Sequence, residues 1–563
     1  MTRGAANRRI VVLGGAFVVL LGAAFVRAFW LQAVQGDAYA AMATRQHRET
    51  VVVPAGRGTV FDRNGKPLAI GEQATTVFAN PQQVDRPKQL TLAIAKELDL
   101  HPAAVYPLLS DRSKGFVYIA RKVDPDDAEA LEKLGFAGLG FYPEELRTYP
   151  QRRVASQVLG YAGLDNAGLE GLERSLNKVL AGKPGSQTIV KDPIGRALDV
   201  VSTKPETPGR NVRLTIDHQI QANAEAILAD TVARHGAHAA SAIVMDPHTG
   251  AVLAMATAPG FNANRFPTTR ADRRRNRAVT DTYEPGSTFK LVTIAAALEE
   301  NVVSPGSAFN LPPTLQVADR VIHEAHDRGT ERMTVRRIVE HSSNIGTITI
   351  AQRLGEGRLA YWIDRFGFGR QTGIDFPGES PGFALPPERW SGSTIGTVPI
   401  GHGIAVTPIQ MARAYSAIAN GGVLVQPRLV EKVDGRPVAR TRRKRVVSRE
   451  VSTQMLAMLR GVVVEGTGTQ AAIPGYTVAG KTGTAAKIDS SGRYSNTDYV
   501  ASFVGLVPAT KPRLVIMVMV DEPSGSIYGG DVAAPAFREI ARFNMQHLEV
   551  PPDAPRTADD SRG

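Results

Sequence analysis

The sequence contains no cysteine, so no disulfide can stabilise its fold. This absence fits an exported protein that needs no disulfides, and it fits a cytosolic protein equally well. The eleven histidines form no His-x-x-x-His or comparable zinc-binding pattern, and no glycine-rich phosphate-binding loop is evident. The sequence therefore predicts an activity that uses neither a metal ion nor an organic cofactor.

The length and the hydrophobic content of the chain predict a folded protein with more than one domain. At 563 residues the chain is too long for one typical domain, which predicts two or three, and 43% hydrophobic residues are enough to form sizeable cores.

Charged residues are missing from a long apolar run near the start of the chain. Residues 10–26 contain no charge, and residues 28–31 continue the run after Arg27, so that it reaches the roughly 20 residues that span a bilayer. The run is preceded by three arginines, Arg3, Arg8 and Arg9. By the positive-inside rule they predict a cytoplasmic N-terminus, with a tail over residues 1–9 and a transmembrane anchor over residues 10–31.

A cleaved signal peptide is the alternative interpretation of this run. Its apolar region would usually be shorter, and the nearest Ala-x-Ala sequence, at residues 38–40, lies well past the run. We therefore expect an uncleaved anchor, with the rest of the chain outside the cytoplasmic membrane.

The chain is basic, with 66 lysines and arginines against 54 acidic residues, a net charge of +12. Part of the excess lies in two runs, residues 273–277 and residues 440–445. Such runs are typical of nucleic-acid binding, but that function requires the cytoplasmic exposure that the anchor argues against. We expect solvated loops and no nucleic-acid partner, with attraction to anionic lipid as a further option.

Three short strings occur in a fixed order along the chain: Ser287-Thr288-Phe289-Lys290, Ser342-Ser343-Asn344 and Lys481-Thr482-Gly483. Together they supply a nucleophile, two amines and the hydroxyl and amide groups that orient a peptide, which indicates serine acyl transfer. Each string alone is weak evidence, because a second Ser-x-x-Lys stands at Ser175 and Lys178 without such context.

The surroundings of Ser287 distinguish it from Ser175. A Pro-Gly turn signal precedes it, and the run that follows is rich in alanine and leucine, so a buried helix should begin near Ser287. Lys290 would then lie on the same face of the helix, one turn later. A lysine can take the serine proton only if burial or a nearby cation lowers its pKa, and apolar neighbours such as Phe289 favour that burial.

The other two strings can be given roles from their chemistry. Ser342 could relay a proton between Lys290 and a leaving amine, and the Asn344 amide could hold a substrate carbonyl. Lys481 lies in a β-branched run interrupted by glycines, where an extended peptide could add to a sheet. We expect Lys481 to attract a substrate carboxylate and to keep Lys290 neutral, while Thr482, Gly483 and Thr484 contribute to substrate binding.

The triple resembles the signature of the penicillin-binding proteins and serine β-lactamases, although Ser343 replaces the aspartate of the Ser-Asp-Asn form of the middle string. Residues 401–410 are similar to a stretch that these transpeptidases carry between the second and third strings, with His402 where glutamine is more usual. Residues 529–537 resemble their C-terminal signature.

The front half resembles one branch of this family. Residues 57–65, 147–150 and 168–173 are similar to conserved boxes of the non-catalytic domain of class B penicillin-binding proteins, and no Glu-Asp-x-x-Phe-type glycosyltransferase motif occurs between residues 32 and 210. The form of these boxes is more similar to the division-type FtsI family than to the elongation type.

The resemblance implies a substrate, a mechanism and partners. Ser287 would attack a D-Ala-D-Ala stem peptide, with the oxyanion held by the backbone N–H groups of Ser287 and Thr484, and an amine of a neighbouring stem peptide would then accept the acyl group. β-Lactams would acylate Ser287. A septal glycosyltransferase of the FtsW type would be the membrane partner. A carboxypeptidase or β-lactamase-like hydrolase, a non-catalytic penicillin-binding sensor and an elongation-type enzyme remain as alternatives.

The pattern of elements predicts a mixed α/β (α+β) fold. Residues 32–209 alternate short strands and helices, which predicts an elongated non-catalytic pedestal of the class B dimerisation type. Residues 210–545, the expected transpeptidase domain, show strands, then a block of helices, then further strands, which is typical of an antiparallel sheet with a helical subdomain. Residues 546–563 form an expected disordered tail.

Specific elements can be predicted within the transpeptidase region. We expect its first helix over residues 217–234 and a hairpin that pairs residues 241–245 with 251–256. Two further buried strands are expected over residues 499–507 and 513–520.

Overall fold

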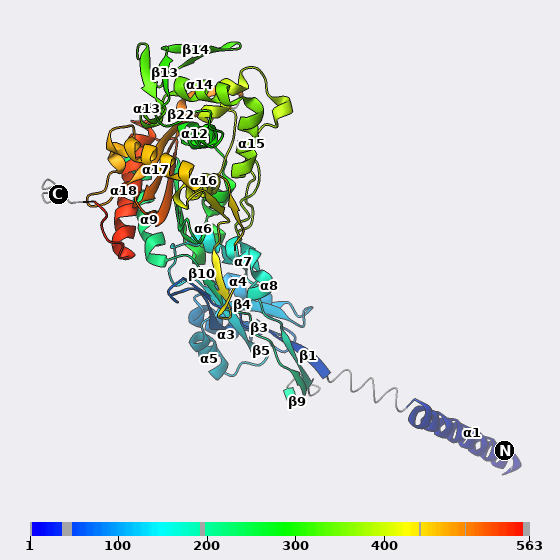
Figure 1. Ribbon diagram of the computed structural model, residues 1–563. Helices are drawn as coiled ribbons and strands as arrows, with labels where there is room; N and C mark the ends of the chain where they lie inside the picture. Colours follow the sequence, from blue (N-terminus) through cyan, green and yellow to red (C-terminus); the bar gives the residue numbers. More distant parts are fainter. Residues whose placement is uncertain (1–2, 36–47, 192–196, 439–440, 490, 555–563) are drawn as a thin grey trace. The chain divides into compact units, whose positions relative to one another are not determined.

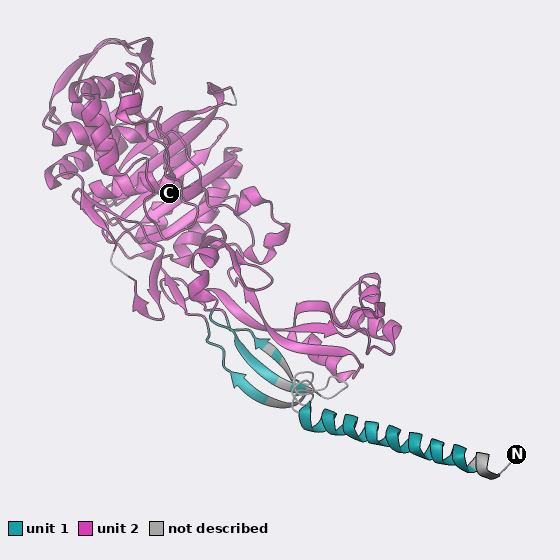
Figure 2. Cartoon of the chain, turned by 90° about the vertical axis from the view of Figure 1, so that its right-hand side faces the viewer, with its two compact units in different colours: residues 1–56, 182–208 teal, residues 57–181, 209–563 magenta. Residues whose placement is uncertain are grey.

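The structure is a computed structural model that describes residues 3–35, 48–191, 197–438, 441–489 and 491–554 (Figure 1). These residues form two compact units (Figure 2). The first unit comprises residues 1–56 and 182–208, and the second comprises residues 57–181 and 209–563.

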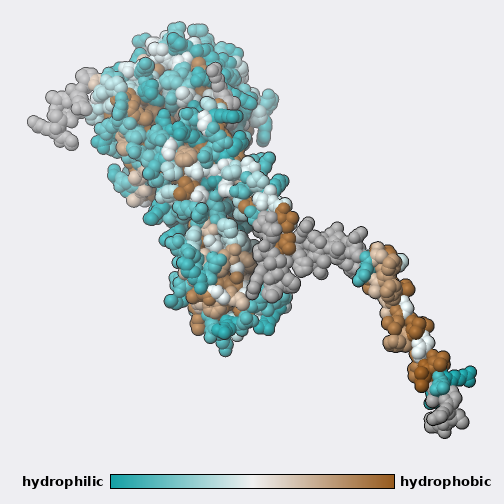
Figure 3. All heavy atoms as spheres, turned by 90° about the horizontal axis from the view of Figure 1, so that it is seen from below, coloured by the Kyte–Doolittle hydropathy of each residue, from teal (hydrophilic) through white to brown (hydrophobic). Residues whose placement is uncertain are grey.

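The first unit contains one long helix and one small sheet. Helix α1 (Arg3–Phe29) continues as a short π-helical turn, η1 (Trp30–Val34). The stretch Asn7–Val34 is long and apolar enough to cross a membrane, and none of it is buried in the structure. Hydrophobic side chains line the visible face of this helix in Figure 3. The antiparallel sheet has the order β1-β8-β9, with β1 (Arg48–Val53), β8 (Gly185–Lys191) and β9 (Ala197–Lys204).

A seven-stranded sheet in the second unit joins distant parts of the chain. Its order is β19-β18-β10-β2-β3-β4, and β5 also pairs with β3. The strands are β2 (Val60–Phe61), β3 (Pro67–Ala79), β4 (Val117–Val123), β5 (Leu139–Thr148), β10 (Val212–Leu214), β18 (Val430–Val433) and β19 (Arg436–Pro437). Because β10 pairs with both β2 and β18, the sheet continues across the predicted boundary at residue 210.

The three front-half boxes meet in one buried ion cluster. Arg57 Nε donates to Glu173 Oε2 at 2.6 Å, and Arg147 Nε donates to Glu173 Oε1 at 2.7 Å. All three side chains are at most 2% exposed. Because both buried arginines are paired with Glu173, the cluster contains no unpaired buried charge. It connects the three chain segments that carry the boxes.

The rest of the front segment is built from short elements. Helices α3 (Pro87–Glu97), α4 (Pro102–Ser110) and α5 (Pro125–Lys133) pack with β3, β4 and β5. The others are α6 (Ser156–Leu159), β6 (Tyr161–Ala162), β7 (Gly168–Glu170), α7 (Gly171–Ser175) and α8 (Asn177–Leu180).

A second, five-stranded antiparallel sheet forms the centre of the transpeptidase region, in the order β12-β11-β23-β22-β21. Its strands are β11 (Ala239–Met245), β12 (Val252–Ala258), β21 (Ala479–Ile488), β22 (Tyr494–Val507) and β23 (Leu514–Asp521). The predicted hairpin and both predicted strands are confirmed. Helices α9 (His218–Arg234) and α18 (Gly529–His547) pack on one face. The predicted first helix is α9, capped by the Asp217 side chain.

Helices on both faces explain the continuous apolar strands. In β23, Ile516 and Val518 share a core with α9 and α18, whereas Met517 and Met519 belong to the core on the other face. That core contains the helices α12 (Lys290–Glu299), α13 (Val335–Glu340), α14 (Asn344–Leu354), α15 (Glu356–Phe366), α16 (Pro408–Ala419) and α17 (Arg449–Val464). A strand buried on both faces carries no alternation of polar and apolar residues.

Short elements complete this region. Two hairpins pair β13 (Ala308–Leu311) with β16 (Glu331–Thr334) and β14 (Thr314–Val317) with β15 (Arg320–His323). A third pair joins β17 (Val423–Val425) to β20 (Arg443–Arg445). The short helices are α10 (Ala271–Arg274), α11 (Arg277–Thr280), η2 (Ala263–Thr268), η3 (Gly286–Phe289), η4 (Pro387–Arg389), η5 (Thr394–Gly396), η6 (Val398–Ile400) and η7 (Thr469–Ala471).

Two predictions are corrected by the structure. The expected tail over 546–563 does not begin at residue 546, because α18 ends at His547 and Asp553 accepts a hydrogen bond of 2.7 Å from Thr477 N; residues 555–563 lie outside the described part. The basic runs are not simply solvated loops. Arg277 is 7% exposed and pairs with Asp281 at 2.9 Å, and residues 443–445 form β20.

Candidate active site

Ser287 lies where the chain enters helix α12. It belongs to the 3-10 turn η3, and α12 follows from Lys290, so the predicted helix start is confirmed. Gly286 has φ of +52°, and a Cβ there would lie 2.6 Å from Thr484 O. Only glycine permits this approach of the nucleophile's turn to strand β21.

Lys290 is buried and points toward the second string. Its Nζ donates to Ser342 O at 2.6 Å and to Asn344 Oδ1 at 2.7 Å, and it lies 3.3 Å from Ser342 Oγ. Within the described residues we find no hydrogen bond between Lys290 and Ser287. The structure thus brings the first two strings together through the lysine.

The environment of both lysines lowers their pKa. Burial lowers the pKa of Lys290 well below its usual value, and the nearby charge of Lys481 lowers it further, while Glu324 acts in the opposite direction. Burial also lowers the pKa of Lys481, to about 7. The prediction that burial and a second cation would keep Lys290 neutral is therefore supported by the arrangement of the two side chains.

The middle string is organised by residues that sequence reasoning missed. Ser342 adopts a left-handed conformation, with φ of +59°, and Ser343 caps α14 by accepting a hydrogen bond from Gly346 N at 2.9 Å. Glu324 accepts hydrogen bonds from Ser343 Oγ at 2.6 Å and from Asn344 N at 2.7 Å.

Glu324 also forms an ion pair with Arg328, and Arg328 Nη2 donates to Ser343 Oγ at 2.7 Å. Both residues lie between β15 and β16, and neither stands in a motif with defined spacing, so the sequence held no signal for them.

The third string lies on an edge strand. Strand β21 pairs with β22 on one side only, which leaves its other edge open for an extended peptide. Lys481 is 1% exposed, and its Nζ donates to Thr482 O and Thr482 Oγ1, both at 3.3 Å. A Cβ at Gly483 would lie 2.9 Å from Pro285 O, so this glycine allows β21 to pack against the turn that carries Ser287.

The three strings converge on a cleft of about 570 Å³. Its lining includes Ser287, Ser342, Asn344, Thr482, Thr484 and His402. His326 and Tyr528 also line the cleft, and their rings lie 5.7 Å apart. The alternative Ser175 has no such surroundings, since it ends helix α7 and donates only to Leu172 O, at 3.4 Å.

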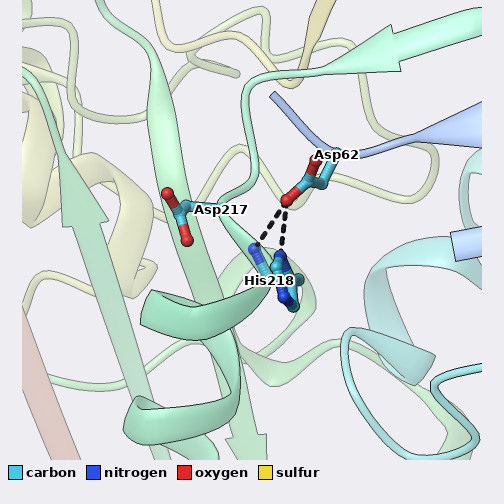
Figure 4. Close-up of side chains that lie close together, drawn as sticks. All are labelled: Asp62, Asp217 and His218. Carbon is cyan, nitrogen blue, oxygen red and sulfur yellow. Dashed lines mark hydrogen bonds and ion pairs between the residues drawn. The ribbon is translucent and has the colours of Figure 1, made fainter. Parts of the chain in front are cut away.

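One cluster outside the cleft has the composition of a metal site (Figure 4). It consists of Asp62, Asp217 and His218, but protein groups already satisfy its carboxylate oxygens. Asp62 accepts hydrogen bonds from Asn64 N, Lys66 N and His218 Nδ1, and Asp217 accepts from Gln219 N, Ile220 N, Asn64 Nδ2 and His547 Nε2. These bonds cap a turn and the start of α9, so we assign the cluster to structure rather than to metal binding.

Comparison with known proteins gives the family. The penicillin-binding protein transpeptidase domain matches residues 240–542, and the penicillin-binding protein dimerisation domain matches residues 52–214. The chain therefore belongs to the penicillin-binding protein transpeptidase family.

Named relatives cover almost the whole chain. The peptidoglycan D,D-transpeptidase FtsI of Escherichia coli K12 is 34% identical over 98% of this chain and 94% of its own length. The penicillin-binding protein PbpB of Mycobacterium tuberculosis is 35% identical over 95% of this chain and 84% of its own. The crystal structure of penicillin-binding protein 3 from Mycobacterium tuberculosis in complex with aztreonam has a TM-score of 0.71 and 32% identity, covering 90% of this chain and 99% of that one.

Proposed function

We propose that this protein is a peptidoglycan D,D-transpeptidase that cross-links stem peptides at the division septum. The observation that carries the proposal is the buried Lys290, which bonds to Ser342 and Asn344 beside the cleft that Ser287 lines. The relative FtsI bears the name of this activity, and the fold and the three strings of this chain match its family.

The proposed acylation follows from the positions of these groups. Neutral Lys290 takes the proton of Ser287 Oγ, which attacks the penultimate D-Ala carbonyl, and the backbone N–H groups of Ser287 and Thr484 stabilise the oxyanion. The proton then passes from Lys290 Nζ to Ser342 Oγ, 3.3 Å away, and to the departing D-Ala amine. Acylation of Ser287 by a β-lactam would follow the same steps.

The remaining groups of the site would hold the substrate. The open edge of β21 would pair with the stem peptide, Thr482, Gly483 and Thr484 would contact it, and Lys481 would attract its carboxylate. Asn344 would hold a substrate carbonyl through its side-chain amide.

The proposed location is the cytoplasmic membrane, with the N-terminus inside the cell and the catalytic region outside. The apolar stretch Asn7–Val34 supports an anchor by length and composition, and the arginines before it support this orientation. We assign residues 1–9 to a cytoplasmic tail, 10–31 to the anchor, 32–209 to the pedestal, and the chain from residue 210 through α18, which ends at His547, to the transpeptidase domain. A septal FtsW-type glycosyltransferase is the proposed membrane partner.

Covalent labelling by a fluorescent penicillin tests the nucleophile. Ser287→Ala should abolish labelling, while Ser175→Ala, in the other Ser-x-x-Lys, should label as the parent does. Labelling of Ser287→Ala would refute the assignment.

The reaction itself is tested by incubating the purified full chain with an N-acyl-D-alanyl thioester and a D-amino acid. Transfer to the amine supports transpeptidation, and release of free acid alone would identify a hydrolase. Depletion of the gene should give filaments if the role is in division, whereas round cells would indicate elongation.

A further inference from the structure

A carboxylate and an imidazole form a pair beside the nucleophile. His402 Nδ1 donates to Glu284 Oε2 at 2.8 Å. The other oxygen, Glu284 Oε1, accepts hydrogen bonds from Gly403 N at 2.8 Å and from Tyr494 OH at 3.2 Å. Because the carboxylate is 11% exposed and accepts on both oxygens, it fixes both the position and the tautomer of the ring.

The fixed tautomer leaves one lone pair on the His402 ring. With Nδ1 carrying the proton that Glu284 accepts, Nε2 of a neutral His402 is an acceptor. The described residues include no hydrogen-bond partner for this nitrogen, and His402 lines the same cleft as Ser287. The arrangement is therefore a base oriented by a third group, which is the geometry that activates a nucleophile.

Backbone packing places His402 close to Ser287. The residues immediately before them, Gly401 and Gly286, are in direct contact, since Gly286 N donates to Gly401 O at 3.2 Å. A Cβ at Gly401 would lie 2.2 Å from Gly286 O. The two side chains thus project from adjoining backbone segments.

The second half-reaction, in which the acyl group passes from Ser287 to an acceptor amine, requires a base. An acceptor amine must lose a proton when it attacks the acyl-enzyme, and His402 is one of the basic side chains that line the cleft together with Ser287.

Building on the proposed function, we propose that His402, oriented by Glu284, is the general base for the acceptor amine. As the amine nitrogen bonds to the acyl carbon, its N–H proton passes to His402 Nε2. When the tetrahedral intermediate collapses, the bond between the acyl carbon and Ser287 Oγ breaks, and the imidazolium returns that proton to Ser287 Oγ. The net change is one new amide and a regenerated serine, so no further reactant is required.

The groups that face the imidazole are consistent with this role. Glu284 stabilises the imidazolium, and Tyr494 lies edge-on to the ring with centroids 5.7 Å apart. Burial, together with the Glu284 charge, raises the pKa of Tyr494 to about 12, so its hydroxyl remains a donor to Glu284. The other titratable groups that line the cleft are His326, His341, Tyr528 and Asp531.

The test separates the two half-reactions in the purified full chain. Acylation is followed with a fluorescent penicillin, and transfer is followed with an N-acyl-D-alanyl thioester and D-alanine as the acceptor. His402→Gln, which restores the more usual family residue, should lower the rate of amine transfer at least tenfold while acylation changes less than threefold.

A matched control is available at His218. Its Nδ1 contacts Asp62 Oδ2 at 2.7 Å, nearly the same geometry, but it does not line the cleft. His218→Gln should leave the ratio of amine transfer to acylation as in the parent.

The outcomes distinguish this inference from the function on which it rests. If His402→Gln transfers to the amine within twofold of the parent, or if acylation falls as much as transfer, His402 is not the acceptor base. If the parent itself releases only free acid, the proposed transpeptidase function fails instead.

Discussion

Asn344 Oδ1 accepts a hydrogen bond of 2.7 Å from Lys290 Nζ, while Asn344 N donates to Glu324 Oε2 at the same distance. The residue that holds the lysine is therefore itself held by a carboxylate. This chain of contacts makes the protonation state of Lys290 sensitive to the charge at position 344.

Replacing Asn344 with aspartate should impair acylation through the pKa of Lys290. A carboxylate within 3 Å of Nζ stabilises the ammonium form and so raises the pKa of Lys290. We expect the rate of acylation by a fluorescent penicillin to fall at least tenfold at pH 7 and to recover partly at pH 9. Asn344→Ala removes the hydrogen bond without adding charge, so its loss of rate should not be relieved at high pH; identical pH profiles for the two variants would contradict this explanation.

Ser343, the middle residue of the second string, should tolerate replacement by aspartate only if Glu324 is replaced as well. Ser343 Oγ lies 2.6 Å from Glu324 Oε1, so Ser343→Asp places two carboxylates in contact. We expect this substitution to lower penicillin acylation at least tenfold, although aspartate stands here in the Ser-Asp-Asn form of the string. Adding Glu324→Gln should restore the rate to within threefold of the parent, because the amide can still accept from Asn344 N. Failure of the double variant to recover would show that the carboxylates are not the cause.

Burial of Lys481 should make stability depend on pH. Its pKa is about 7 in the folded protein against an ordinary value of 10.5, so between these values the unfolded chain binds more protons. The free energy of unfolding should therefore rise with pH in this window, by about 1.4 kcal/mol per unit from this one group. In Lys481→Met this contribution is absent, and denaturant unfolding at pH 7, 8 and 9 measures the difference. Equal slopes for both proteins would refute the assignment.

Gly401 should not tolerate alanine. Its φ is +86°, and an added Cβ would lie 2.2 Å from Gly286 O, so the turn that carries Ser287 would have to move. Gly435 is a matched control, because it has φ of +73° but no atom within 4 Å of an added Cβ. Gly435→Ala should cost only about 1 kcal/mol of backbone strain, whereas Gly401→Ala should also lose most of its penicillin acylation. Similar effects of the two substitutions in thermal unfolding and labelling would contradict the packing argument.

The sequence predicted the parts of the site that depend on local chemistry. The Pro-Gly turn and the alanine-rich run predicted a helical start near Ser287, which lies in the turn η3 that leads into α12, and the apolar neighbours of Lys290 indicated its burial. The run around Lys481 indicated an edge strand with close backbone approach at glycine, which Gly483 confirms.

Sequence reasoning missed contacts between residues far apart in the chain. Glu324 and Arg328 act on Ser343 only because the β14–β15 hairpin folds back toward α14, and no local pattern distinguishes them from other surface charges. Arg277 was expected in a solvated loop because its run is basic, whereas tertiary packing buries it against Asp281. Asp553 was expected in a disordered tail because of the proline-rich composition around it, which does not reveal that the distant Thr477 N donates a hydrogen bond to its side chain.

The shared seven-stranded sheet has a consequence for how this protein can be divided. Strand β10 lies between β2, from the front segment, and β18, from the catalytic half. A cut before residue 210 would convert an interior strand into an unpaired edge, which is a ready template for aggregation. We therefore expect that the catalytic half cannot simply be separated from the front segment. Strand β2 of the front segment covers the edge of β10, and it precedes all three strings in the chain.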